Sequence, residues 1–84
     1  MIFSVLVEVS LRPGIADPEG ATIERALPAL GFTGISSVRA GKAFRFDVDS
    51  GSEAEAVSTA QQLAERLLSN PVIEQCVVRV ESSR

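Results

Sequence analysis

The sequence predicts an α+β protein, a two-layer sandwich with the element order β-α-β-α-β. Three segments alternate apolar and polar residues with the period of a half-buried strand. Between them lie two segments whose apolar residues recur at helical spacing. We therefore expect a three-stranded, mainly antiparallel sheet with two helices on one face, in a single domain that spans residues 1–84.

The first strand is predicted over residues 3–11, where every odd position is apolar and the even positions include Ser4 and Glu8. Two aliphatic residues, Ile2 and Leu6, fall on the otherwise polar face. Cover by another subunit and simple exposure of scattered aliphatic side chains explain them equally well.

Residues 12–20 contain two prolines and two glycines, so this stretch has few accessible conformations and predicts a rigid, shaped loop. Asp17 is expected to cap a helix that begins at Pro18, and Gly31 to end it in the left-handed conformation. Inside this helix Pro28 removes a backbone hydrogen bond at a cost of about 3 kcal/mol, which predicts a kink or an early end.

The second strand region covers residues 35–49, where Val38, Phe44 and Val48 share one parity. Because the alternation continues across Gly41, we favour one long strand with a glycine kink or bulge. A tight hairpin at this point is the alternative, and it would give a ferredoxin-like β-α-β-β-α-β chain.

A second helix follows, with Ser52 and Glu55 at the spacing of a capping box. Its apolar stripe reaches Leu68, and the dipeptide Asn70-Pro71 ends it. Alternation after that dipeptide predicts a third strand, followed by a frayed polar tail at residues 82–84.

Charge and composition exclude several classes of protein. The formal net charge of -3 and the lack of Trp and Tyr argue against nucleic-acid binding. No secretion signal and no apolar run long enough to span a membrane are present, which predicts a cytoplasmic protein without membrane partners. An 84-residue monomer would be marginally stable, so self-association is expected.

Few residues suit catalysis. The chain has no histidine, the commonest general base and metal ligand, and Cys76 lies in an apolar strand, where it is a small buried hydrophobe rather than a nucleophile. Four acidic residues between positions 47 and 55 are better explained as a solvated strand end and helix start than as a metal site. We therefore assign no catalytic, cofactor-binding or metal-binding residue.

One cluster of cations stands out in this acidic chain. Arg39, Lys42 and Arg45 lie within seven residues of the predicted long strand. They form either a patch that meets an acidic partner surface or an ordinary solvated strand face.

Four segments, in this order and spacing, resemble the PurS family, the small subunits of bacterial formylglycinamide ribonucleotide amidotransferase. The likeness runs from about Val5 to Glu74, with departures at Pro28 and Cys76. The four segments are Asp17-Pro18-Glu19-Gly20, Leu30-Gly31-Phe32, Val38-Arg39-Ala40-Gly41-Lys42 and Leu67-Leu68-Ser69-Asn70-Pro71-Val72-Ile73-Glu74.

The resemblance implies a non-catalytic subunit of phosphoribosylformylglycinamidine synthase in de novo purine biosynthesis. Such a subunit bridges a glutaminase, which releases ammonia, and an ATP-dependent synthetase, which consumes it. The complex uses ATP, Mg and glutamine, whereas this chain is expected to bind no cofactor and to form a homodimer or higher homo-oligomer, through its sheet edges. Candidate subunit-contact residues are Arg12, Pro13, Asp17, Arg39, Lys42, Arg45, Asn70 and Glu74. A small-molecule-binding regulatory domain of ferredoxin-like type is the alternative function.

Overall fold

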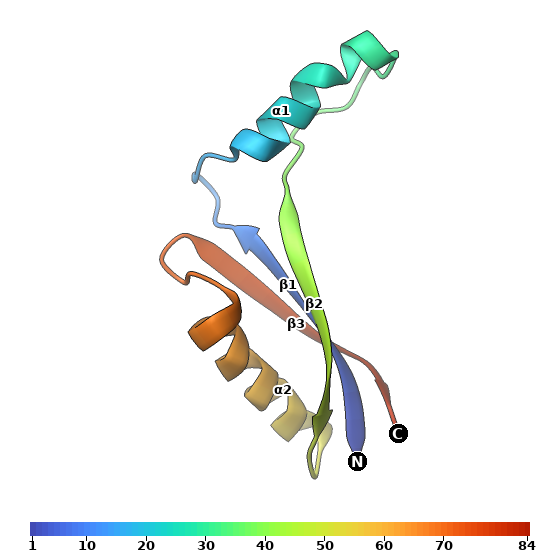
Figure 1. Ribbon diagram of the computed structural model, residues 1–84, viewed down its shortest axis with the longest axis vertical. Coiled ribbons are helices and arrows are strands. Elements are labelled where there is room, and N and C mark those ends of the chain that lie inside the picture. The colour runs from blue at the N-terminus through green and yellow to red at the C-terminus, as the bar shows by residue number, and fades with distance from the viewer.

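The computed structural model describes all 84 residues, and its elements follow the order β1 (Ile2–Leu11), α1 (Pro18–Ala26), β2 (Gly41–Asp49), α2 (Glu53–Leu63) and β3 (Glu74–Ser83) (Figure 1). The three strands form one antiparallel sheet in the order β2-β1-β3, so β1 is central. This confirms the predicted α+β class, the β-α-β-α-β order and the three-stranded antiparallel sheet.

The second strand is shorter than predicted and is not a hairpin. β2 begins at Gly41, which pairs with Ser10 near the end of β1, and residues 35–40 are irregular. Beyond Leu11 the chain turns away, so residues 35–40 have no neighbouring strand to pair with. The prediction of one long strand over residues 35–49 was therefore wrong for residues 35–40. The alternative prediction, a ferredoxin-like hairpin, was wrong altogether.

The hydrophobic core lies between one face of the sheet and α2. Alternate residues of β1 are buried there with Ala56 and Ala60 of α2 and with Ala64 of the π-helical turn that follows it (Ala64–Leu68). Side chains of β2 and β3 pack around them. Because alanine side chains are small, the helix can approach the central strand closely. The buried residues of this cluster are Phe3, Val5, Val7, Val9, Ala56, Ala60 and Ala64.

The opposite sheet face has no helix over it and carries ion pairs. Arg79 pairs with Glu8 at 2.7 Å, and Arg45 pairs with Glu81 at 3.0 Å. Leu6 is buried on this face, and its cross-strand partners are the same two arginines, whose aliphatic stems can cover it. The chain itself therefore covers Leu6, and neither of the two explanations offered for it is needed.

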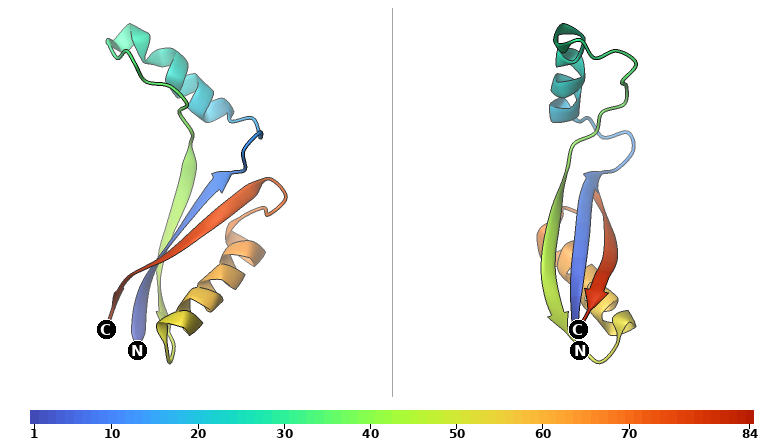
Figure 2. Two further views of the ribbon diagram at one scale, coloured as in Figure 1. Left: turned by 180° about the vertical axis from the view of Figure 1, so that it is seen from behind. Right: turned by 90° about the vertical axis from the view of Figure 1, so that its right-hand side faces the viewer.

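α1 does not lie on the sheet with α2 but extends beyond its end (Figures 1 and 2). It makes no extensive contact with any strand. We call residues 18–40, which comprise α1, a 3₁₀ turn at Pro28–Leu30 and the returning segment, the arm. The Cα radius of gyration is 16.3 Å, against about 12 Å for a compact chain of this length. The expectation of both helices on one face thus holds for α2, while α1 is held elsewhere by contacts described below.

The expected ends of α1 are present. Asp17 is the N-cap, Pro18 takes the first helical position, and α1 ends before Pro28, where the 3₁₀ turn begins. Gly31 ends that turn in the left-handed conformation, with φ of 88°.

The ends of α2 and β3 are also defined by hydrogen bonds. Ser52 caps α2 by accepting the N–H of Glu55, whose carboxylate accepts the Gly51 N–H. The predicted frayed tail was wrong, because β3 continues to Ser83 and Arg84 exchanges backbone hydrogen bonds with Ile2.

Candidate functional site

The predicted contact segments meet at one end of the sheet, where β1 ends and both β2 and β3 begin (Figure 1). We call this region the loop end. It consists of residues 12–20, 38–42 and 70–74, which are far apart in the sequence. Seven of the eight predicted contact residues lie there, and Arg45 lies further along β2.

The loop that leaves β1 opens with a tight turn. The Ile15 N–H donates to the Arg12 carbonyl at 3.1 Å, and Gly14 has φ of 86°. Proline at the second position and a left-handed glycine at the third are the residues that a type II turn requires. Pro13 and Gly14 therefore account for the rigid first part of this loop.

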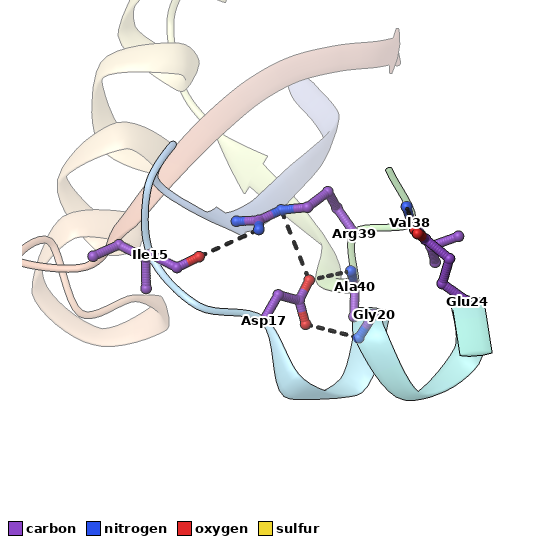
Figure 3. A network of polar contacts seen from close by, with 7 residues as sticks. All are labelled: Ile15, Asp17, Gly20, Glu24, Val38, Arg39 and Ala40. Atoms are coloured by element: carbon purple, nitrogen blue, oxygen red, sulfur yellow. Dashed lines mark hydrogen bonds and ion pairs between the residues drawn. The ribbon is translucent and has the colours of Figure 1, made fainter. Parts of the chain in front are cut away.

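Asp17 joins the start of α1 to the start of β2 (Figure 3). Its Oδ1 accepts the Gly20 N–H at 2.9 Å, and its Oδ2 accepts the Ala40 N–H at 2.8 Å. Arg39 places its Nε 3.8 Å from Oδ2 and donates to the Ile15 carbonyl at 3.2 Å. Only 5% of the Asp17 side chain is exposed, so these bonds are largely shielded from water.

The electrostatics of Asp17 follow from these partners. The Gly20 N–H, and next the Ala40 N–H, hold the pKa of the Asp17 carboxyl below its usual value because both bonds favour the charged form. Desolvation opposes this shift, and the Arg39 guanidinium adds to it. Asp17 is thus an anion at neutral pH, and both of its carboxylate oxygens accept hydrogen bonds from backbone N–H groups of this chain.

Gly20 lets the return segment pass close to α1. A Cβ at this position would lie 2.3 Å from the Val38 carbonyl oxygen, which is closer than real contacts allow. One turn further along the helix, Glu24 Oε1 accepts the Val38 N–H at 2.8 Å (Figure 3). The residue before Val38 is Ser37, which has φ of 58°, a left-handed conformation that is uncommon for serine. Both the N–H and the carbonyl of Val38 therefore lie against α1.

The turn before β3 is joined to the other two segments. The Asn70 N–H donates to Glu74 Oε1 at 2.7 Å, and the Asn70 side chain accepts the Val72 N–H at 3.2 Å. Arg12 donates from Nε to the Pro71 carbonyl at 3.1 Å. Lys42 lies 4.0 Å from the second oxygen of Glu74, so this carboxylate connects the starts of β2 and β3.

The three cations do not form one free patch. Arg39 faces Asp17, Lys42 faces Glu74, and Arg45 pairs with Glu81 on the open sheet face. Each remains substantially exposed, with 45% to 67% of its side chain accessible. Their role as subunit contacts stays a prediction.

An open cavity of about 370 Å³ lies at the loop end, where Asp17, Lys42 and Glu74 contribute charged groups that are already bonded within the chain. No group of three or more His, Cys, Asp or Glu side chains is placed to hold a metal ion. None of the helices has the length and apolar character needed to cross a bilayer.

A family model described as PurS, phosphoribosylformylglycinamidine (FGAM) synthase, matches residues 4–82. The chain belongs to the PurS family. The phosphoribosylformylglycinamidine synthase subunit PurS of Archaeoglobus fulgidus is 42% identical over 74 residues, which are 88% of this chain and 90% of the relative. The PurS subunit of Mycobacterium leprae is 44% identical over 77 residues, 92% of this chain and 94% of the relative.

Solved PurS structures have the same fold. The crystal structure of the PurS subunit from Thermotoga maritima superposes with a TM-score of 0.87 at 31% identity, covering 95% of this chain and 92% of that one. A chain in the structure of PurLQS from the same organism gives a TM-score of 0.87 at 31% identity, with 95% and 98% covered. These values confirm the resemblance seen in the sequence.

Sequence reasoning missed two residues of this PurS chain that shape the site. Glu24 was not selected, although it lies on the same helix face as Asp17 and Gly20, at spacings of seven and four residues. Gly20 was recognised only as a loop residue, whereas its lack of a Cβ allows the contact with Val38. The helical spacing of the two acids was the signal that could have found Glu24.

Proposed function

We propose that this chain is the small, non-catalytic subunit of phosphoribosylformylglycinamidine synthase in de novo purine biosynthesis. In this role it bridges the glutaminase and the ATP-dependent synthetase and supports the transfer of ammonia between them. The observation that carries the proposal is the likeness, over nearly the whole length of both chains, to a chain of the Thermotoga maritima PurLQS structure.

The chemical need for such a bridge is simple. Ammonia that reaches bulk water at neutral pH is mostly protonated and loses its nucleophilic lone pair. A closed contact between the two larger subunits prevents that loss by excluding water from the route. A small subunit can hold this contact by shape alone and needs no reactive group of its own.

The loop end suits this role because its surface is already ordered. Internal hydrogen bonds hold the turn at Arg12 and Pro13, the Asp17 network and the turn at Asn70. Ordering a loop when it binds reduces affinity, so a surface that is ordered beforehand binds more tightly. We propose that Arg12, Pro13, Arg39, Lys42 and Asn70 touch the larger subunits, since they are exposed, while Asp17 and Glu74 shape the surface from within.

Self-association is part of the proposal. The accessible surface of the chain is 5662 Å², which exceeds by about 850 Å² the value expected for a compact monomer of 8.9 kDa. A standard protein interface buries about 800 Å² on each partner. The uncovered apolar residues of the arm are Ile23, Leu30, Phe32 and Ile35.

A second copy of this chain is the proposed cover for these residues. A two-fold contact uses the same patch on both chains, so it would bury the excess surface of each at once. This gives a homodimer, from which a higher homo-oligomer can be built. Pairing through the exposed edges of β2 and β3 is the other route to self-association.

The proposal includes the setting of the reaction. ATP, Mg and glutamine are used by the larger subunits, this chain binds no cofactor, and the complex works in the cytoplasm. Arg45, on the open sheet face, is proposed as a separate contact point with an acidic partner surface.

The test is reconstitution of the synthase from separately purified glutaminase and synthetase subunits, with and without this chain. We expect glutamine-dependent formation of product to require the chain, because only that reaction needs ammonia to pass between subunits. Synthesis from added ammonium salt by the synthetase serves as the control and should not depend on the chain. Equal glutamine-dependent rates in both mixtures would refute the bridging role.

A further inference from the structure

The arm is attached to the rest of the molecule at its base alone. α1 has no extensive contact with the sheet, and two chain segments, at residues 12–17 and at 40–41, join the arm to the strands. Figure 2 shows from two further sides that the arm lies beyond the sheet end. Core packing therefore does not determine its direction, and other interactions must.

Two carboxylates, one at the N-cap of α1 and one within α1, accept hydrogen bonds from backbone N–H groups, and Arg39 adds a hydrogen bond at the base by donating to the Ile15 carbonyl. Asp17 bonds the first turn of the helix and the residue before β2 simultaneously, through Gly20 and Ala40 (Figure 3). Glu24, seven residues later, bonds the Val38 N–H at 2.8 Å. Asp17 thus closes the base of the arm, and Glu24 prevents α1 from rotating about that base or separating from the return segment.

The contact between these two points is too close for a looser arrangement. Gly20 has no Cβ, and the Val38 carbonyl occupies the place where one would be. Ser37, the neighbour of Val38, is held at φ of 58°. A residue keeps such a conformation only where its surroundings impose it. Here the Val38 N–H is bonded to Glu24, and the Ala40 N–H, two residues later, is bonded to Asp17.

We propose that Asp17 and Glu24 are positioning residues that set the direction of the arm, and hence the geometry in which its apolar side chains meet a second copy of this chain. The inference rests on the proposed self-association. Neither carboxylate needs to touch the second copy. Each acts through the backbone of the return segment, and loss of either makes the arm mobile, so that it must be ordered again during association.

Asp17→Asn separates positioning from helix capping. The asparagine side-chain oxygen can still accept the Gly20 N–H, so α1 keeps its cap. The amide nitrogen then faces the Ala40 N–H and Arg39, where two donors oppose each other. Glu19→Gln is the matched control, because it removes one negative charge from the same helical turn at a side chain with no hydrogen bond in the structure.

Glu24 provides an independent pair of variants. Glu24→Ala removes the acceptor for the Val38 N–H without touching the cap, whereas Glu24→Gln retains an oxygen that can accept it. If Glu24 acted only within α1, Glu24→Gln and Glu24→Ala would have the same effect on arm exchange and self-association. Rescue by Gln therefore identifies the bond to Val38 as the one that matters.

The experiment measures two quantities on the full chain: amide hydrogen exchange by residue, and the dissociation constant of self-association by sedimentation. We expect Asp17→Asn and Glu24→Ala to speed exchange of residues 18–40 by about tenfold while exchange in β1 and β3 stays unchanged, and to weaken self-association by about tenfold. Glu19→Gln and Glu24→Gln should behave as the parent chain.

Three results would overturn the inference: unchanged arm exchange in both disruptive variants, unchanged self-association despite a mobile arm, or a parent chain that is monomeric at every concentration. Global unfolding of Asp17→Asn would be recognised by faster exchange in β1, and Glu24→Ala would then decide. These results are independent of reconstitution with the parent chain, so failure of positioning and failure of the bridging function can be told apart.

Discussion

Replacing Gly20 with alanine tests directly whether the return segment is seated against α1. The new Cβ would lie 2.3 Å from the Val38 carbonyl oxygen and 2.8 Å from Asp17 Oδ2, whereas ordinary contact begins at 3.4 Å. The oxygen of Val38 belongs to the backbone, so rotation of a side chain cannot relieve this clash. The return segment must therefore recede by about 1 Å.

The energetic result is a difference between two opposing effects. At a helical position with free space, alanine is more stable than glycine by up to about 1 kcal/mol. At Gly20, overpacking costs about 1–3 kcal/mol, and the displaced segment stretches the 2.8 Å bond from Ala40 to Asp17. We expect Gly20→Ala to have a free energy of unfolding about 1–2 kcal/mol below that of a variant with the same glycine-to-alanine change at a control position.

Gly51→Ala is that control. Its Cβ would meet only the Glu55 carboxylate, at 3.2 Å, and this flexible side chain needs to shift by only a few tenths of an ångström while it still accepts the Gly51 N–H. Both variants are compared by urea denaturation at one protein concentration, because self-association raises apparent stability, and by exchange of residues 18–40. If Gly20→Ala were as stable as Gly51→Ala and its arm exchanged no faster, the described contact between α1 and Val38 would not exist in solution.

Four further changes have defined outcomes. Ala60→Leu should lower the free energy of unfolding by about 1–3 kcal/mol in urea, since Ala60 is fully buried between α2 and the sheet. Leu30→Ser, at a side chain that is 70% exposed, should change monomer stability by less than about 0.5 kcal/mol yet weaken self-association in sedimentation; unaltered association would exclude Leu30 from the interface. Arg45→Glu should cost less than about 1 kcal/mol, because its pair with Glu81 is exposed, and should reduce capture of the larger subunits; full capture would remove it as a contact. The pKa of the Asp17 carboxyl is lowered in the folded chain, so the stability that this carboxylate gives the fold is complete above its ordinary pKa of 3.8 and is lost as pH falls through the lower folded value. The amide proton shifts of Gly20 and Ala40 should therefore titrate below pH 3.8. A midpoint above that pH would contradict the network.

The inward and outward faces of the strands could be predicted because their pattern is local, whereas the strand order and register come from the structure. Every second residue of β1 faces α2, and the same alternation recurs in β2 and β3, so the pairs Val7 with Phe44 and Val7 with Val78 follow once the strands are aligned. The helix ends were predictable for the same reason, since a cap depends on residues within one turn. Asp17 and Ser52 were both identified this way.

The direction of the arm could not be predicted, because the same alternation arises without a strand. Val38 and Ala40 continue the parity of β2, yet their N–H groups bond to carboxylates of Glu24 and Asp17 instead of a neighbouring strand. Periodicity records which residues are apolar and does not identify the partners of backbone donors. The apolar stripe of α1 likewise predicted a buried face, whereas Ile23 is 45% exposed in the structure.

The candidate site shows a similar division. The sequence identified the segments that meet at the loop end, because proline, glycine and capping residues mark constrained loops. It did not reveal that each cation of the predicted patch faces a different carboxylate, since Glu74 and Glu81 come from β3 and reach Lys42 and Arg45 only in the folded chain. Pairs between distant segments depend on strand register, which must be known before they can be derived.

The distribution of burial explains why polar bonds, and not apolar packing, hold the arm. Only 9 of 84 residues are buried, and the hydrophobic core cluster is confined to the sheet, α2 and the π-helical turn after α2. Apolar packing at the base of the arm would use side chains such as Ile23 that remain available on its surface for a partner. Backbone N–H groups that donate hydrogen bonds to the carboxylates of Asp17 and Glu24 hold the arm without covering that surface. A subunit that functions by its shape can in this way be rigid before assembly and still present its apolar residues to a second copy.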